Sequence, residues 1–283
     1  MPTSLSCSVL RVHKLVPTLA ALPLAVTLSG CSVTDGVLNV VGPRPNGEVI
    51  ALAEQASADW QHGDPADTEL RELRKAHSDQ LVGEARRLCG TEPSGEVPRT
   101  CDIDLDAAAL PSAESVDQLV TASADAAGRV PGDSVDLVVS QAIDAAALRS
   151  VPLAGQGLSL DDATDAQAAN HMLDQEYAFQ YALGVAEAYA DEALRARIGD
   201  LLAASSERCA FLSAALGSAA DQPAAGYEFS QGVRGPADTQ QATELVEQLQ
   251  HDLVAGWRRV AADAKHTQWR DAAIRLAAQA QRA

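Results

Sequence analysis

The residues best suited to metal chemistry in this sequence are Glu176, Glu247 and His251. Carboxylates and imidazoles bind iron when several converge. Paired iron sites inside helical bundles take a glutamate from each of two helices and a Glu-x-x-His pair from each of the other two. No Glu-x-x-His spacing occurs in the chain. The nearest candidates are Asp59-x-x-His62 and Asp263-x-x-His266, both at predicted helix ends, and Glu247 with His251 one helical turn apart. Glu176, Glu247 and His251 are the candidates for an atypical site, with iron as its ion.

The pattern of apolar residues separates these three candidates. One face of the segment that carries Glu247 and His251 is marked by a repeat of leucines, which are Leu245, Leu249 and Leu253. Glu247 and His251 fall off this stripe, so we expect them on a solvated face. Glu176 shares its face with Met172 and Leu183, so we expect it to point inward and to be hydrogen-bonded rather than metal-bound. The favoured interpretation is a chain without metal or cofactor.

Cys31 is suited to a different chemistry, the attachment of lipid. The chain opens with basic residues and no acid, continues with an apolar run at 15–28, and then reads Leu28-Ser29-Gly30-Cys31. This layout is that of a secretory signal, and its last four residues match the lipobox of bacterial lipoprotein signals. The match implies cleavage before Cys31, diacylglycerol on its thiol, and palmitate or a similar acyl chain on the new amino terminus. An ordinary signal peptide with a chance cysteine is the alternative.

The lipobox places the mature protein outside the cytoplasm. We expect a signal peptide at 1–30 and a tether at 31–47, where Gly and Pro cluster and no helical period is sustained. The apolar run is shorter than the roughly 20 residues that a membrane span needs. Two acyl chains hold a protein stably at a bilayer, whereas one does not. The predicted location is the outer face of the cytoplasmic membrane.

The charge of the chain limits its partners. The formal net charge is −18, and it becomes −20 when the predicted signal peptide is removed with its two basic residues. Nucleic acids and anionic lipid surfaces are bound through basic patches, so this acidity argues against both. Solubility of an exported protein explains the acidity more simply than a dedicated cation site does.

Three cysteines follow Cys31. Cys89 and Cys101 bracket a loop rich in Gly and Pro, and outside the cytoplasm such a pair predicts a disulfide. Cys209 is left without a partner in the sequence. It falls in a helical stripe with Leu212 and Leu216, which predicts a buried, unreactive thiol.

The chain reads as helical throughout, because no strand pattern of period two competes with the helical one. The predicted helices cover residues 48–61, 66–89, 112–129, 133–150, 164–189, 192–216, 239–264 and 266–282. Asp133 and Asp238 are expected as N-caps, the latter in a capping box with Gln241. The fold class is therefore all-α.

The links between the predicted helices repeat in both halves as short, long, short. The long links are residues 90–111 and 217–238. Four helices joined with one long crossover between the second and third have the ferritin-like topology. The sequence thus predicts tandem four-helix bundles at 48–150 and 160–283, the second and by duplication the first of them ferritin-like. A single larger helical domain is the alternative.

Two local patterns in the C-terminal half point to a family. In the first, Glu-His-x-x-x-Tyr-x-Tyr-Gly, the chain matches at Glu176, Tyr181 and Gly184 and has Tyr177 in place of the histidine. The second is Ala-His-Arg-x-Arg-Arg-x-x-Leu. Its matching residues are Ala204, Arg208 and Leu212. With these patterns, residues 164–283 resemble the C-terminal ferritin-like domain of unknown function found in actinobacterial lipoproteins. The resemblance implies the fold and leaves the activity open.

No sequence pattern indicates catalysis. The chain has no Gly-rich phosphate loop and no Gly-x-Ser-x-Gly elbow, so we name no catalytic residue. We expect a non-enzymatic binding or interaction module of the cell envelope, with an unknown envelope protein or ligand as its partner. The suspected surface is the loop 217–238 with Tyr227 and Phe229. The favoured interpretation of these aromatics alone is a plain connection in which they close the end of the bundle. The alternative function is an atypical ferritin-like metal-binding oxidoreductase.

Overall fold

The computed structural model describes residues 42–105, 110–150, 152–153, 158–228 and 235–283. These described residues form helices and no strand. The expectation of an all-α fold is thereby confirmed. The eight α-helices of the described part are α2 (Gly47–His62), α3 (Thr68–Cys89), α4 (Val116–Ala127), α5 (Val135–Ala147), α6 (Ala163–Glu187), α7 (Glu192–Leu216), α8 (Thr239–Asp263) and α9 (Thr267–Arg282). Not one of these helices combines the length and the apolar character that a membrane crossing requires.

Polar side chains fix where most of these helices begin. The residues whose side chains accept backbone N–H bonds at a helix start are Asn46, Asp67, Ser115, Asp162, Asp191 and Asp238. The expected N-cap at Asp238 is confirmed, since its side chain accepts from the backbone of Gln241 at 2.9 Å. The Gln241 side chain accepts from the backbone N–H of Ala237, not from that of Asp238, so the capping box is incomplete. The expectation for Asp133 is wrong. That residue lies in a short 3-10 turn before α5, and its carboxylate pairs with Arg87 instead.

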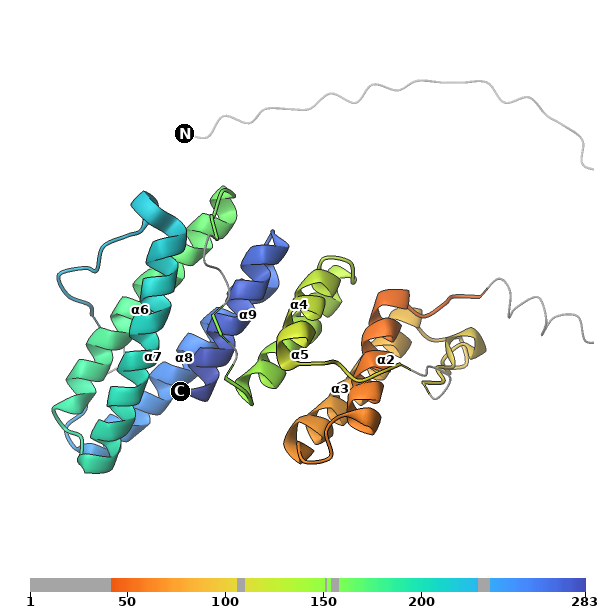
Figure 1. The fold of residues 1–283 in the computed structure, drawn as a ribbon, viewed down its shortest axis with the longest axis horizontal. Coiled ribbons are helices and arrows are strands. Elements are labelled where there is room, and N and C mark those ends of the chain that lie inside the picture. The colour runs from red at the N-terminus through yellow and green to blue at the C-terminus, as the bar shows by residue number, and fades with distance from the viewer. Residues whose placement is uncertain (1–41, 106–109, 151, 154–157, 229–234) are drawn as a thin grey trace, which may run out of the picture.

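The helices form four hairpins that lie side by side in one row (Figure 1). Along the row the order is α2–α3, α4–α5, α8–α9 and α6–α7. The last hairpin in sequence therefore lies between two earlier ones. It packs through α9 against α4 and α5, and through α8 against α6.

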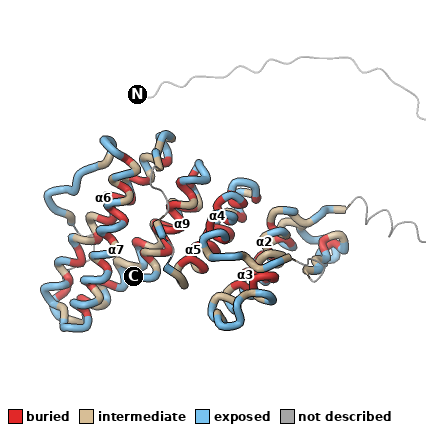
Figure 2. The backbone as a smooth tube through the Cα atoms, viewed as in Figure 1, coloured by how far each residue is buried: buried red, intermediate tan, exposed pale blue. Residues whose placement is uncertain are grey.

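One buried core runs through the row. Buried residues line the faces by which neighbouring helices meet (Figure 2), and they form a single cluster from Val49 to Ala280. The helix α9 is buried most extensively, with Trp269, Ile274 and Leu276 at 1% exposure or less. The core does not stop at the sequence boundary expected between 150 and 160, because α5 packs against both α8 and α9.

Polar contacts reinforce the packing of α4–α5 on α8–α9. The buried Arg275 of α9 pairs with Asp117 of α4 and donates from Nε to Asp271 at 2.6 Å. Asp271 also accepts from Thr121 of α4 at 2.9 Å. These bonds satisfy a guanidinium that is 3% exposed, and so they fix the position of α9 against α4.

The hairpin α2–α3 is attached to the row more loosely, with α3 touching α5. Gln141 of α5 donates to the carbonyl of His77 at 3.2 Å. The segment after α3 is fastened back on its hairpin, because the Sγ atoms of Cys89 and Cys101 lie 2.08 Å apart, the distance of a disulfide. This is the pair that the sequence predicts.

Candidate functional site

The structure separates the three residues considered for a metal. Glu176 is fully buried on α6. Glu247 and His251 lie on the exposed face of α8, where Glu247 approaches Arg197 at 3.7 Å. They do not converge with Glu176. The expected inward glutamate and solvated pair are thus both found.

The carboxylate of Glu176 is surrounded by donors from two other helices. Its Oε1 accepts from Arg208 Nε at 2.6 Å and from Trp257 Nε1 at 2.7 Å. Its Oε2 accepts from Ser205 Oγ at 2.6 Å and from Arg208 Nη2 at 2.9 Å. A carboxylate has about four acceptor positions, and these donors occupy them. The group holds α6, α7 and α8 together at one level of the core.

The charge that balances Glu176 comes from arginine. Arg208 of α7 is 1% exposed and forms a two-pronged contact with the carboxylate. Arginine suits this role because its planar fork matches a carboxylate and it stays charged when buried. A metal ion would need the oxygens that Arg208 already holds, so this donor set does not fit iron.

The same network reaches Cys209. Gln180 donates to Ser205 Oγ at 3.0 Å and lies 3.4 Å from Cys209 Sγ. Burial, followed by the nearby Glu176 charge, raises the pKa of the Cys209 thiol to about 11. The thiol is therefore protonated at neutral pH and a poor nucleophile, as the sequence predicts.

A second buried polar group joins the two helices of the first hairpin. Arg74 of α3 donates to Asp59 of α2 at 2.8 Å, and Arg74 Nη1 lies 3.1 Å from His77 Nδ1. Burial and then the Arg74 charge lower the pKa of His77 to about 4. Asp59 also accepts the backbone N–H of Ala113 at 2.7 Å, which holds the long link against α2. The hydrogen bonds of these buried polar residues are structural contacts, so they indicate no separate functional site.

Asp162, Asp165 and His266 form the tightest cluster of metal-ligating types in the described part of the chain. Both aspartates already accept backbone hydrogen bonds. Asp162 caps α6, while Asp165 accepts the backbone N–H groups of Lys265 and His266 at 2.9 and 3.0 Å. Asp165 on α6 thus caps the turn into α9 from another helix, and the cluster is a structural joint.

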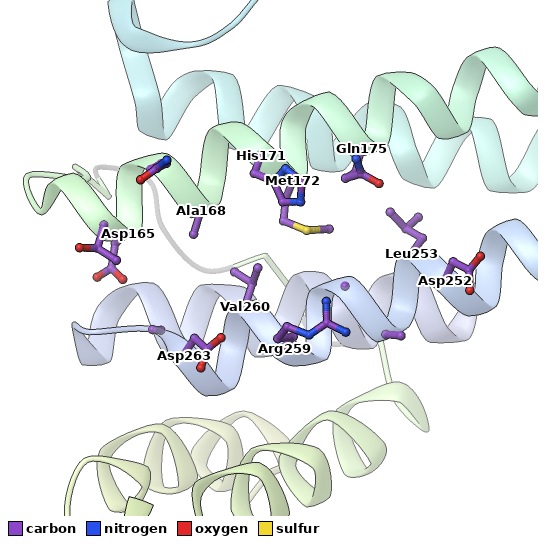
Figure 3. A pocket seen from close by; sticks show the side chains of 15 residues that line it. Asp165, Ala168, His171, Met172, Gln175, Asp252, Leu253, Arg259, Val260 and Asp263 are labelled. Atoms are coloured by element: carbon purple, nitrogen blue, oxygen red, sulfur yellow. The ribbon is translucent and has the colours of Figure 1, made fainter. Parts of the chain in front are cut away.

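A groove lies between α6 and α8 on the surface of the described residues (Figure 3). This groove has a volume of about 710 Å³. The side chains of Ala168 and Met172 on α6, and of Leu253 and Val260 on α8, point into the space between the helices. Gly256 lies opposite Met172, and a Cβ there would meet nothing nearer than the Met172 Cε at 3.5 Å. Small residues on both helices therefore keep the groove open.

A second hollow of about 320 Å³ continues the groove along the same two helices. The two hollows share Gln175, Asp252 and Leu253. The second is bounded by Tyr227 from the crossover between α7 and α8, whose hydroxyl donates to Asp174 of α6 at 3.2 Å. Tyr227 also packs on Tyr181 with ring centroids 5.9 Å apart. Phe229, the other aromatic predicted for this surface, lies outside the described residues, as does Cys31.

Sequence reasoning identifies Glu176 and Tyr227 but misses their partners. Arg208 is a charged residue within the apolar stripe of α7, beside Cys209, and that position is the signal for a buried ion pair. Trp257 continues the leucine stripe of α8, and its indole N–H donates to the buried carboxylate of Glu176. No sequence signal marks the groove, because it depends on which helices become neighbours.

Comparison with known proteins gives no relative. No protein-family model matches the chain, and neither a curated protein sequence nor a solved structure matches it.

Proposed function

We propose that this protein is a lipid-anchored binding module of the cell envelope, without catalytic activity, whose binding site is the groove between α6 and α8. The observation that carries the proposal is the groove itself. It has an apolar floor, a rim of charged side chains, and a continuation that ends against Tyr227. Ligand sites commonly combine an apolar lining with a few placed polar groups.

The location rests on the lipobox at 28–31. In this proposal Cys31 carries the acyl chains, residues 1–30 are removed, and residues 31–47 join the anchor to α2. The predicted Cys89–Cys101 disulfide is in keeping with an oxidising compartment. Replacement of Cys31→Ser is expected to abolish labelling by radioactive palmitate and to release the protein from the membrane fraction. Unchanged labelling and fractionation would contradict the anchor.

We further propose that α6–α9 form a ferritin-like bundle related to the domain of unknown function in actinobacterial lipoproteins. The support is the order of links, a short turn after α6, a long crossover after α7 and a short turn after α8. The residues that match the family's patterns include Glu176 and Arg208, which form the buried pair. A similar origin for α2–α5, as a first bundle of a tandem pair, is the corresponding proposal for the N-terminal half.

The rival function, an atypical ferritin-like metal-binding oxidoreductase, is less well supported. It needs Glu176 to give up the donors described above, and it needs Glu247 and His251 to reach the core from the exposed face of α8. The discriminating measurement is the metal content of residues 32–283, purified without chelators and titrated with ferrous iron. Stoichiometric iron that is lost in Glu176→Gln or His251→Asn would favour the oxidoreductase.

The binding site has its own test in a neutral apolar dye, Nile red, whose emission rises and shifts to the blue in apolar surroundings. Residues 32–283 contain every described helix and the whole core, so this chain is the protein to use. We expect saturable binding that Gly256→Leu abolishes by filling the floor. Gly199→Leu places the same side chain on the exposed face of α7 and is expected to change nothing. Equal dye binding by all three proteins would contradict the proposed site.

A further inference from the structure

The charges along the groove indicate what it binds. The carboxylates that line the two hollows and face solvent at least in part belong to Asp174, Glu228, Asp252 and Asp263. Arg259 is the one guanidinium of this lining, and His171 adds an imidazole. None of these five carboxylate and guanidinium groups forms an ion pair within the described part of the chain. The rim is therefore acidic, and its charged groups are free of ion pairs with the described residues.

The shape of the groove indicates the form of its ligand. The lining runs along α6 from Thr164 to Ala182 and along α8 from Leu249 to Ala264. At about 1.5 Å per residue, the α6 side is about 27 Å long. An amphipathic helix of about five turns has this length, and such helices bind by laying their apolar face into a groove of this kind. Small molecules would use only a part of it.

From these observations we infer that the groove binds a basic amphipathic helix of a partner protein. The inference rests on the proposed function, since it names the ligand class of the same site. Apolar side chains of the partner helix would contact Ala168, Ala255 and Val260, and its flanking lysines or arginines would lie against Asp252 and Asp263. A second copy of this chain is disfavoured by its net charge of −18, and an anionic lipid surface is disfavoured by the same rim carboxylates.

The rest of the groove is consistent with this occupant. Small residues, Ala168 and Gly256, are part of the lining on both sides of the groove, and small residues let a helix approach closely. Tyr227 lies at the end of the second hollow. Its hydroxyl donates to Asp174 and accepts from the backbone N–H of Ala224. A partner helix would therefore meet a fixed aromatic edge, which suits the role of an anchor in recognition.

The test uses designed helical peptides of eighteen residues, with leucine on one face and the other face lysine, glutamine or glutamate. Each peptide carries a fluorophore, and its anisotropy is followed during titration with residues 32–283. The lysine peptide is expected to bind at least about tenfold more tightly than the glutamine peptide, which corresponds to about 1.4 kcal/mol. The glutamate peptide is expected not to bind.

Two matched pairs of variants locate the binding. Gly256→Leu should weaken binding of the lysine peptide at least about tenfold, and Gly199→Leu should leave it unchanged. The double variant Asp252→Lys/Asp263→Lys should weaken it by a similar factor. Glu187→Lys/Asp200→Lys changes the net charge equally at exposed positions outside the groove, and it should have little effect. The rim variants keep every core contact, so they test the site even if Gly256→Leu fails to fold.

The outcomes separate the two proposals. If the glutamine and lysine peptides bind equally and Gly256→Leu weakens both, the groove is a binding site and the charge argument is wrong. If all peptides fail while Nile red binding still depends on Gly256, the ligand is not a helix and the binding module stands. Loss of both signals would overturn both proposals. If the protein forms dimers and the rim variants disrupt them, the occupant of the groove is a second copy of the chain and the partner-helix proposal is wrong.

Discussion

At position 176 the protein holds a carboxylate where water has no access, and the surrounding helices supply all of its hydrogen bonds. Removing such a charge from water is costly, and a nearby opposite charge with good geometry offsets the cost. The two-pronged contact with Arg208 gives that geometry, while Ser205 and Trp257 fill the remaining acceptor positions. A buried pair of this kind is by itself weak evidence for net stability, because the desolvation cost of both charges opposes their attraction.

Breaking the pair from one side should therefore be much worse than replacing it. Glu176→Gln leaves Arg208 charged and uncompensated in the core, and we expect the free energy of unfolding to fall by about 3–5 kcal/mol. The double variant Glu176→Leu/Arg208→Met removes both charges and should recover most of that loss. Urea unfolding followed by circular dichroism measures both values. If Glu176→Gln is as stable as the parent protein, the Arg208 guanidinium must become solvated in the variant, and the expectation is wrong.

His77 makes stability depend on pH. Its pKa is about 4 in the folded protein and 6.5 when unperturbed, because burial and Arg74 oppose a positive charge there. Protonation would also convert Nδ1, which lies 3.1 Å from Arg74 Nη1, into a donor facing a donor. The unfolded chain thus binds a proton first as the pH falls below 6.5, and the His77 contribution to stability is lost progressively down to pH 4.

The expected loss is about 1.4 kcal/mol per pH unit within that window, or about 2 kcal/mol by pH ~5. Unfolding free energies at about pH 7 and pH 5 measure it. His77→Asn should remove this part of the decrease, whereas His62→Asn, at an exposed helix end, should not. A decrease of the same size in His77→Asn would assign the pH dependence to other groups.

At the scale of elements, most of the fold follows from local signals. The helical period and the capping residues locate all eight described helices to within a few residues. Asp133 is an instructive error, because its side chain has a cationic partner, Arg87, from another helix and so does not act as a cap. Local signals do not predict which hairpins pack against one another. The long links at 90–111 and 217–238 permit several arrangements, and only the burial of α9 on every side selects one.

The link after α3 carries its own constraint. The disulfide Cys89–Cys101 closes a sequence separation of 12 residues, which in the chain-entropy model contributes about 3 kcal/mol. The double variant Cys89→Ser/Cys101→Ser should lose stability mainly in α2–α3, because that hairpin makes few contacts with the row. Hydrogen exchange should show faster exchange in α3 than in α6–α9. Uniformly faster exchange would mean that the row unfolds as one unit.

At the scale of the whole molecule, the packing predicts which parts fold alone. The hairpin α4–α5 covers α9, so a chain of residues 110–283 should keep its helical content and cooperative unfolding. A chain of residues 158–283 would expose the face of α9 that carries Arg275, and it should be far less stable or self-associate. Circular dichroism and size-exclusion chromatography compare the two. Equal stability would favour an independent C-terminal bundle over one continuous domain.

The row also sets the position of the groove relative to α2. Helix α2 lies at one end of the row, and the groove lies near the other end (Figure 1). With neighbouring helices about 8–10 Å apart, the intervening hairpins place the groove well away from α2. A partner bound in the groove would therefore leave the α2–α3 hairpin uncovered.

The place of α9 in the row has a consequence for synthesis. The helix that packs against α4, α5, α7 and α8 follows all four of them along the chain. Until α9 is made, α4 lacks its main neighbour outside its own hairpin. A nascent chain can therefore form the individual hairpins early, but it can join α4–α5 to α8–α9 through the buried faces of α9 only after Thr267–Arg282 has been synthesised.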